Sequence, residues 1–403
     1  MQLTFIKEIE KNLTEFMRGG ERIRLIDNIL SKEKSWIEES GEKIKVLLEK
    51  MRLLNASDID IGGSNSDSKI WFRIHGIKSP NYDLPQFSDD EITCLLLSIL
   101  SEQQKKILYE KKNIDFSVGL QFPGDEKMSR FRGDVYFESN LLVANFRRIN
   151  QELFPISSLE FPEMIIKRLN LTNEKSGLIL ITGITGSGKS TTLDSIVNMN
   201  NETNKAHIVI ISNPIEYIHK SKKCIIRHRE VGTDVLSFRE GTIQALRQDP
   251  DIVVVGEMRD AETIATVLEV TDSGHKVFST LHTSSSVESI HRIIAEFPPK
   301  EQTRIRFRLA DTLKLVISQK LIPTLDGKLT MAKEILSVTN SVKAAIKNNN
   351  ISEIFQMLSE GKKHGMFTLQ QDLFRLVKKG KISSKIAMDY SNNKKLMLQL
   401  LKY

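Results

Sequence analysis

The chain has 403 residues, and at about 150 residues per domain this length favours two or three domains. Hydrophobic residues make up 40% of the sequence and charged residues 27%, which is typical of a globular protein and excludes disorder over most of the chain. The formal net charge is +7, but residues 376–403 hold seven lysines against one aspartate. The rest is nearly neutral, so the basic character gives no reason to expect a nucleic-acid partner.

Cysteine and apolar content restrict the class of protein further. Cys94 and Cys224 are too few for a disulfide framework or a four-cysteine zinc site. Residues 1–7 lack the pattern of a signal peptide, and no apolar stretch approaches the roughly 20 residues that span a bilayer. We therefore expect a cytoplasmic protein whose attachment to a membrane is at most peripheral.

Residues 1–55 are expected to form a helical N-terminal extension. Apolar residues recur at helical spacing from Leu3 to Phe16, Gly19 and Gly20 interrupt the pattern, and it resumes at Ile23. An extension that packs on its own chain or on a neighbour is favoured over a membrane-surface helix, because the polar face mixes Glu with Lys.

The pattern changes to α+β over residues 56–150. We expect strands at 69–74, 115–122, 130–137 and 141–149, and one leucine-rich helix at 89–108. Residues 151–172 contain two prolines and are interpreted as a linker with a short helix.

Strands and helices then alternate over residues 173–298. The predicted strands are 178–182, 207–211, 252–255 and 276–280, and the predicted helices are 189–199, 237–247 and 261–271. This alternation predicts an α/β sheet with crossover connections. After Pro298 and Pro299 the sequence predicts a mainly helical subdomain over residues 299–403.

A complete phosphate-binding loop follows the first of these strands. The pattern G-x-x-x-x-G-K-[ST] requires glycines because backbone N–H groups must converge on phosphate oxygens where no Cβ fits. Its lysine places a charge on the β- and γ-phosphates, and its hydroxyl binds Mg²⁺. The residues are Gly183, Ile184, Thr185, Gly186, Ser187, Gly188, Lys189 and Ser190, followed by Thr191. The sequence therefore predicts a nucleotide site that uses ATP and Mg²⁺.

Two acidic residues follow other strands of this region. Glu257 follows the apolar run 252–255 after one glycine, as in a Walker B strand. There it would hold the Mg²⁺ shell together with Ser190. Glu216 follows the strand 207–211, which we expect beside the P-loop strand, and it is the candidate to orient the attacking water.

The region from Gly177 to Thr283 resembles the ATPases of type IV pili and type II secretion, and most of all the twitching-motility (PilT-like) group. The match rests on the P-loop and on three further motifs, which are Asn213–Tyr217, Leu246–Asp260 and Ser273–Thr283. Weaker similarity extends the match to about residues 52–400. The resemblance implies a RecA-like P-loop NTPase core at 173–298, preceded by a PAS-like domain at 56–150.

The resemblance also implies roles for single residues. Glu216 would be the catalytic glutamate and Glu257 the Walker B acid, and His275 and His282 would lie near the γ-phosphate. Two arginines of the PAS-like domain would reach the phosphates, with two others as alternatives. The first pair is Arg132 and Arg147, and the alternatives are Arg227 and Arg229.

The sequence departs from the family pattern in two places. Ser212-Asn213 stands where the family has Glu-Asp, and an amide cannot hold Mg²⁺ by charge. The helix at 341–347 lacks the paired residues of retraction motors. Against assembly-type relatives, the chain has no Cys-x-x-Cys pair and no N-terminal extension of about a hundred residues.

The sequence therefore predicts a hexameric cytoplasmic ATPase at the inner-membrane base of a type IV pilus, most consistent with retraction. Its expected partners are identical subunits, an inner-membrane platform protein and other pilus ATPases, with membrane association through these partners and no nucleic acid. The alternatives are an assembly or secretion ATPase, a RecA-type DNA motor, or a nucleotide-binding regulator with weak turnover.

Overall fold

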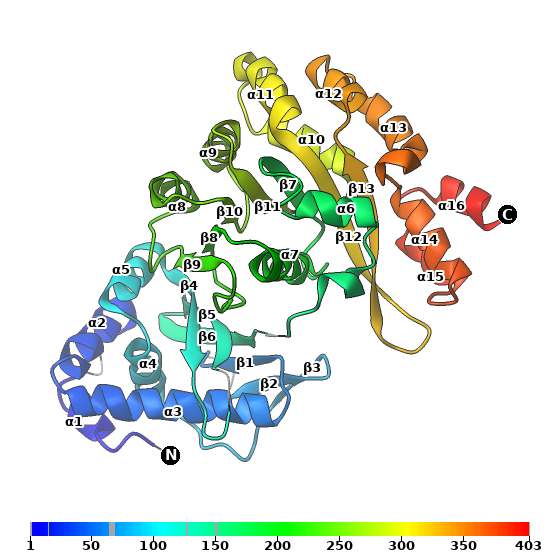
Figure 1. The fold of residues 1–403 in the computed structure, drawn as a ribbon. Helices are drawn as coiled ribbons and strands as arrows, with labels where there is room; N and C mark the ends of the chain where they lie inside the picture. The colour runs from blue at the N-terminus through cyan, green and yellow to red at the C-terminus, as the bar shows by residue number, and fades with distance from the viewer. Residues whose placement is uncertain (1, 15, 64–68, 126–127, 150–151, 403) are drawn as a thin grey trace. The chain divides into compact units, whose positions relative to one another are not determined.

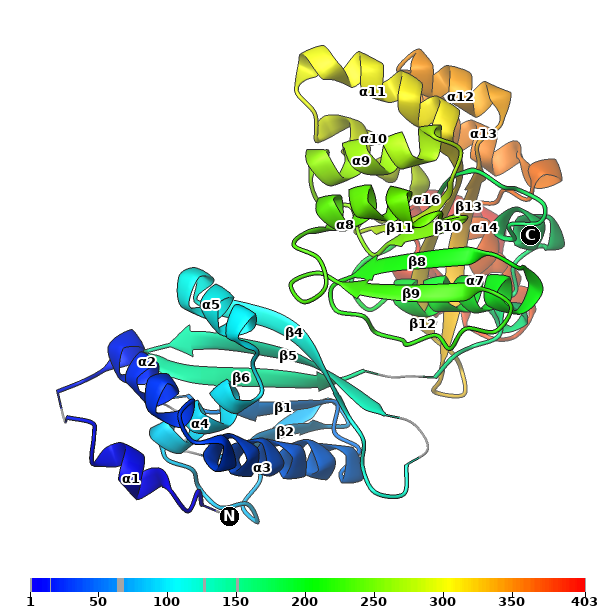
Figure 2. The same cartoon turned by 60° about the vertical axis from the view of Figure 1, so that its left-hand side comes forward.

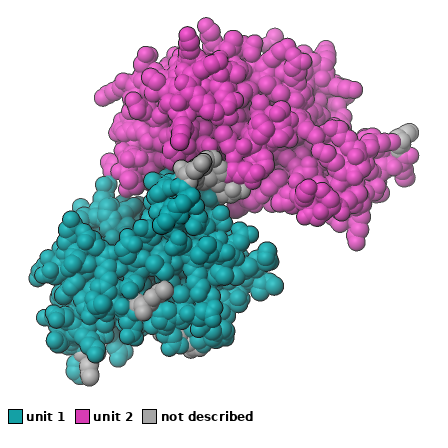
Figure 3. Space-filling view, turned by 60° about the horizontal axis from the view of Figure 1, so that its bottom comes forward, with its two compact units in different colours: residues 1–151 teal, residues 152–403 magenta. Residues whose placement is uncertain are grey.

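The computed structural model describes residues 2–14, 16–63, 69–125, 128–149 and 152–402. The chain divides into two compact units, residues 1–151 and residues 152–403, which Figure 3 shows in teal and magenta.

A six-stranded antiparallel sheet forms the centre of the first unit, with the strand order β3-β2-β1-β6-β5-β4. Alternate residues of β5 give the sheet two different faces, because Phe131 and Val135 are buried while Arg132 and Asp134 are half exposed. The buried residues pack against helices, which form one apolar core with them. The strands are β1 Asp58–Ile61, β2 Trp71–Ile74, β3 Ile77–Pro80, β4 Asn113–Leu120, β5 Ser129–Glu138 and β6 Leu141–Arg148.

The helices of this unit are α1 Ile6–Glu10, α2 Gly19–Leu30, α3 Lys34–Leu53, α4 Asp89–Ser98 and α5 Glu102–Lys111. The single helix expected at 89–108 is wrong: α4 and α5 are separate. Ser101 begins the second helix because its side chain accepts from the backbone N–H of Gln104, whose own side chain accepts from the backbone N–H of Ser101. The sequence did contain this capping-box signal.

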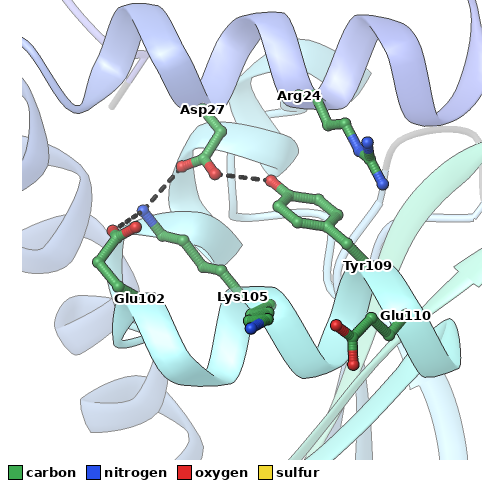
Figure 4. Close-up of a pocket in the computed structure, with 7 residues that line it drawn as sticks. Arg24, Asp27, Glu102, Lys105, Tyr109 and Glu110 are labelled. Carbon is green, nitrogen blue, oxygen red and sulfur yellow. Dashed lines mark hydrogen bonds and ion pairs between the residues drawn. The ribbon is translucent and has the colours of Figure 1, made fainter.

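The N-terminal extension packs on its own chain. Phe5 stacks on Trp36 with ring centroids 4.8 Å apart. Asp27 of α2 accepts hydrogen bonds from Lys105 Nζ and from the Tyr109 hydroxyl of α5, each at 2.7 Å (Figure 4). Burial raises the pKa of Tyr109, so this hydroxyl stays protonated and continues to donate. The extension is therefore part of the first unit's fold.

The second unit is built on a seven-stranded sheet with the order β13-β12-β7-β11-β10-β8-β9, in which only β13 is antiparallel (Figures 1 and 2). Helices α8 to α11 pack on one face and α6 and α7 on the other, with an apolar core on each side. The strands are β7 Gly177–Thr182, β8 His207–Ser212, β9 Ile225–Glu230, β10 Ile252–Val255, β11 Lys276–Leu281, β12 Leu313–Pro323 and β13 Leu329–Ser337.

Three helices of the second unit lie close to their predicted positions at 189–199, 237–247 and 261–271, whereas the helix at 286–295 was not predicted. The helices of this unit are α6 Glu163–Leu169, α7 Lys189–Thr203, α8 Phe238–Ala245, α9 Ala261–Asp272, α10 Ser286–Ala295, α11 Pro299–Thr312, α12 Asn340–Lys347, α13 Ile354–Glu360, α14 Leu369–Lys378, α15 Ser384–Tyr390 and α16 Lys394–Leu401. Within the part of the chain that the structure describes, no helix is both long and apolar enough to cross a bilayer.

Two expectations about this sheet need correction. Residues 299–403 are not only helical, because β12 pairs with the P-loop strand β7 and β13 pairs with β12. The strand before Glu216 is not beside the P-loop strand, since β11 and β10 lie between β7 and β8. Strand neighbours are decided by pairing across the sheet, which local sequence does not report.

Two buried lysines hold the segment before β7 against the sheet. Lys276 Nζ donates to the carbonyl oxygens of Arg168 and Glu174, both at 2.7 Å, and Lys333 Nζ donates to that of Leu159 at 2.8 Å. Burial lowers the pKa of each lysine to about 8. This segment therefore belongs to the second unit rather than being a free linker.

Candidate nucleotide site

The predicted site residues of the second unit collect at one edge of its sheet. Strands β7, β11, β10 and β8 are parallel and in register, with Thr182 opposite Leu281 and Val255 opposite Ile211. Their carboxyl ends therefore lie side by side, and this is where ligands bind in open α/β sheets. The P-loop, Glu216, Glu257 and His282 all follow these ends.

The P-loop has the backbone of a phosphate cradle. Gly183 has φ 153°, and a Cβ there would lie 2.5 Å from the carbonyl oxygen of Gln319, so no other residue fits. Residues 184–186 are exposed, while Ser187 and Lys189 are buried. Helix α7 begins directly at Lys189 without a side-chain cap, so its first N–H groups are available to an anion.

Lys189 lies among acidic and polar groups of the site. Its Nζ donates to the carbonyl oxygens of Gly183 and Ile184 at 2.8 and 3.1 Å, and it lies 3.5 Å from His282 Nδ1. Burial lowers the pKa of Lys189, and the charges of Glu257 and Glu216 oppose that shift. Both glutamates are thus near enough to act on the P-loop lysine.

Glu257 is held between two side chains. Its Oε1 pairs with Arg259 Nη2 at 2.7 Å, and its Oε2 lies 3.6 Å from His282 Nε2. Burial, followed by the charge of Lys189, lowers the pKa of His282, so this ring is neutral at pH 7. The backbone carbonyl of His282 accepts from Arg292 Nη1 at 3.1 Å, which holds the residue in place. A neutral ring here can donate a hydrogen bond from its N–H to a phosphate oxygen.

The residues after β8 approach the same edge. The backbone N–H of Ile215 donates to Glu230 Oε2 of β9 at 3.0 Å, which fixes the chain next to Glu216. Asn213 Oδ1 is buried and has no hydrogen-bond partner in the structure. A buried, unpartnered amide oxygen is costly unless something else satisfies it.

The residues at this edge fit a magnesium ion. Ser190 supplies a hydroxyl, Glu257 a carboxylate, and the buried Asn213 Oδ1 a neutral oxygen, which are the hard oxygen donors that Mg²⁺ prefers. This set has one negative charge fewer than a set with Asp in place of Asn213.

His275 does not join the site. It precedes β11, and Lys276 at the start of that strand lies opposite Gly177 at the start of β7. At about 3.3 Å per residue, His275 is therefore roughly 15–20 Å from the P-loop edge. The backbone N–H of Gly177 donates to the carbonyl oxygen of His275 at 3.1 Å. The prediction that His275 lies near the γ-phosphate does not hold for the P-loop of its own chain.

The predicted arginines lie on other strands. Arg132 of β5 and Arg147 of β6 are opposite each other in the first unit, where they pair with Asp115 and Asp58. They share one face of that sheet, with side chains 43% and 64% exposed, and so present two neighbouring positive charges.

The alternative arginines belong to β9 of the second unit. Arg229 Nη2 donates to Gln244 Oε1 at 2.8 Å, whereas Arg227 is exposed. β9 is an edge strand of this sheet. The strands β11, β10 and β8 lie between it and the P-loop strand β7. Their position gives no added reason to prefer them over Arg132 and Arg147.

Sequence reasoning missed two residues that shape the site. Arg259 neutralises one oxygen of Glu257, and Gln319 Nε2 donates to the carbonyl oxygen of Ser187 at 2.7 Å. Gln319 comes from β12, in the region expected to be helical. Because β12 pairs with β7, Gln319 lies beside the P-loop although it is more than a hundred residues away in the sequence.

A P-loop helix and an acidic, magnesium-compatible edge on a parallel sheet define a nucleotide-binding α/β protein. The family model "Type II/IV secretion system protein" matches residues 36–398, and the chain belongs to this family.

Named relatives agree with this family. The chain is 37% identical to a "Twitching motility protein" of Neisseria gonorrhoeae over 81% of this chain and 85% of the relative. It is 38% identical to the "Type IV pilus retractation ATPase PilT" of Pseudomonas aeruginosa over 76% of this chain and 87% of the relative. The solved structure of the pilus retraction motor PilT with bound ADP aligns with a TM-score of 0.76 at 35% identity, covering 88% of this chain and 98% of that one.

Proposed function

We propose that this protein is an ATPase that works as a homo-hexamer and drives retraction of a type IV pilus. One observation carries the proposal: Lys189, Glu257 and His282 meet at one edge of the sheet, in a chain whose relatives are named for twitching motility and pilus retraction. The proposal puts the protein in the cytoplasm at the inner-membrane base of the pilus, held there by a platform protein and other pilus ATPases.

Different side chains at this edge of the sheet would bind the phosphates, hold Mg²⁺ and activate the attacking water. The P-loop N–H groups and Lys189 would bind the β- and γ-phosphates, and Ser190 and Glu257 would hold Mg²⁺. When bound, Mg²⁺ neutralises charge that develops on the phosphates. Glu216 would accept a proton from the attacking water, and neutral His282 would report the presence of the γ-phosphate.

The first unit would supply a positive charge to the reaction. Arg132 and Arg147 are adjacent on the sheet of the PAS-like domain proposed for residues 56–150. Such a charge is worth about 10³ to 10⁵ in rate in related phosphoryl transfers. Closure of the PAS-like and RecA-like domains on ATP, and their opening after hydrolysis, would convert chemistry into movement.

Two measurements test this function. Phosphate release by the purified protein is expected to be ATP-dependent, and its absence would favour a nucleotide-binding regulator. Deletion of the gene is expected to leave cells with excess surface pili, since pili are still built but no longer withdrawn. Cells without pili would instead favour an assembly ATPase, and normal pili with failed export would favour a secretion ATPase.

A first prediction concerns Asn213. If Asn213 lies in the Mg²⁺ shell, Asn213→Asp restores a negative charge and lowers the Mg²⁺ concentration for half-maximal activity. One partly screened charge is worth about 1 kcal/mol, or about five-fold in Mg²⁺. The competing view is that Asn213 only caps its loop, and the lack of any hydrogen bond at Oδ1 gives that view no support. Superimposable Mg²⁺ titrations of the two proteins would remove the metal argument.

A further inference from the structure

The segment that carries Glu216 returns along the P-loop helix. This segment, residues 213–224 between β8 and β9, is named here the Glu216 segment. Near its end, Asn201 of α7 donates from Nδ2 to the carbonyl oxygen of Lys220 at 2.8 Å and accepts from the backbone N–H of Lys222 at 2.9 Å. The segment is therefore bound to the same helix that begins at the P-loop lysine.

A hydrogen bond between a buried histidine and a partly exposed aspartate makes a second link nearer to the site. His219 Nε2 donates to Asp194 Oδ1 at 2.9 Å, and the side chain of His219 is 1% exposed. Asp194 lies on α7 one helical turn after Ser190, the hydroxyl of the P-loop. The pair thus connects the first turns of the phosphate-binding helix to a residue three positions beyond Glu216.

Neighbouring groups fix the orientation of His219. Its ring meets that of Tyr217 with centroids 4.6 Å apart, and it stacks on His228 of β9 at 6.0 Å. Its backbone N–H donates to His228 Nε2 at 3.1 Å. These contacts hold the ring with its Nε2 directed at Asp194 Oδ1.

Glu216 therefore lies between two fixed points. On one side the N–H of Ile215 is bound by Glu230, and on the other side His219 is bound by Asp194. The first point fixes Glu216 to the sheet. The second fixes it to the helix that holds the phosphates, at a position closer in sequence to Glu216 than the bonds of Asn201. The position of a catalytic group relative to its substrate affects the rate strongly, because a displacement of about 1 Å can cost roughly a hundred-fold in rate.

We propose that the Asp194–His219 pair is a positioning link that sets the distance of Glu216 from the nucleotide bound on the P-loop helix. The inference rests on the catalytic role proposed above for Glu216. The pair touches no reacting atom and acts only through the place it gives to that carboxylate.

Steady-state kinetics of the full chain test the link. Asp194→Ala keeps a good helix-forming residue in α7 but removes the acceptor, and we expect kcat to fall about ten-fold or more while KM for ATP and nucleotide affinity change less than about two-fold. His219→Gln keeps an N–H donor near the position of Nε2 and is expected to retain most of the activity. His219→Leu, which has no donor, is expected to behave like Asp194→Ala.

The matched control is Glu202→Ala. Glu202 is also an acid of α7 that binds the Glu216 segment, through Lys222 Nζ at 2.6 Å, but both side chains are about half exposed and lie at the far end of the segment. Its kcat is expected to equal that of the wild type. An equal loss in Glu202→Ala would mean that any weakening of the segment slows the enzyme and would overturn the proposal.

A double variant separates this inference from the role of Glu216 itself. In a Glu216→Gln background, Asp194→Ala is expected to cause no further loss in kcat, because the carboxylate that the link positions is already gone. A further loss of the same factor would overturn the link. A change confined to melting temperature or nucleotide affinity, with kcat intact, would also overturn it. Normal turnover by Glu216→Gln alone would instead reject the catalytic role of Glu216.

Discussion

Lys189→Ala is expected to abolish ATP hydrolysis and to weaken nucleotide binding, while the fold persists. Lys189 Nζ bonds to the carbonyl oxygens of Gly183 and Ile184, at the surface of the cradle that phosphates would occupy. Removing it takes away the one P-loop side chain whose positive charge faces the β- and γ-phosphates. Phosphate release with excess ATP measures the effect, and circular dichroism with thermal unfolding checks the fold.

Lys205→Ala is the control for this variant, because Lys205 is exposed just beyond the other end of α7. Its turnover is expected to match that of the wild type. If Lys189→Ala keeps more than about a tenth of the wild-type turnover, the P-loop does not serve catalysis as a charge donor, whatever its geometry.

Glu216→Gln is expected to bind ATP normally and to lose most of its hydrolysis. The amide has the shape of the carboxylate but accepts no proton from water, and general-base catalysis contributes roughly 10²- to 10⁴-fold. Because the neighbouring N–H of Ile215 is bound by Glu230, the amide is expected to remain where the carboxylate was. Single-turnover hydrolysis and binding of a fluorescent ATP analogue separate the chemical step from affinity.

Glu257→Gln is the informative comparison, since Glu257 is expected to serve Mg²⁺ rather than water. Its loss is expected to be relieved in part by high Mg²⁺, which should not rescue Glu216→Gln. Glu262→Gln, which changes a glutamate with a 78% exposed side chain on α9, controls for loss of charge alone. Normal turnover by Glu216→Gln together with an inactive Glu257→Gln would assign the base to another residue.

Local sequence was sufficient for the elements whose formation depends on local interactions. The P-loop motif is complete in the sequence, because its glycines, lysine and hydroxyl lie in one short segment and each has a separate chemical reason. Strand β10 was predicted with its true ends, since a run of four apolar residues between acidic and glycine residues forms a short buried strand. Glu257 followed from that strand.

Sequence reasoning failed where a residue's role depends on distant parts of the chain. It assumed that β8 neighbours β7, and it missed that β12 supplies Gln319 to the P-loop. The family resemblance also implied that His275 and His282 both lie near the γ-phosphate, although the two lie at opposite ends of β11 within one chain. A short motif tells which residues share a strand, but it does not tell which strands pair with one another in the sheet.

The sequence by itself determined that this protein binds a nucleotide, because the residues that bind phosphate lie next to one another in a single motif. Only the tertiary structure decided how the site is completed. Parallel pairing aligns the carboxyl ends of β7, β11, β10 and β8, and so brings residues about 25 to 100 positions apart to one edge. Packing of the Glu216 segment on α7 then joins Asp194 to His219, a contact that no spacing in the sequence reveals.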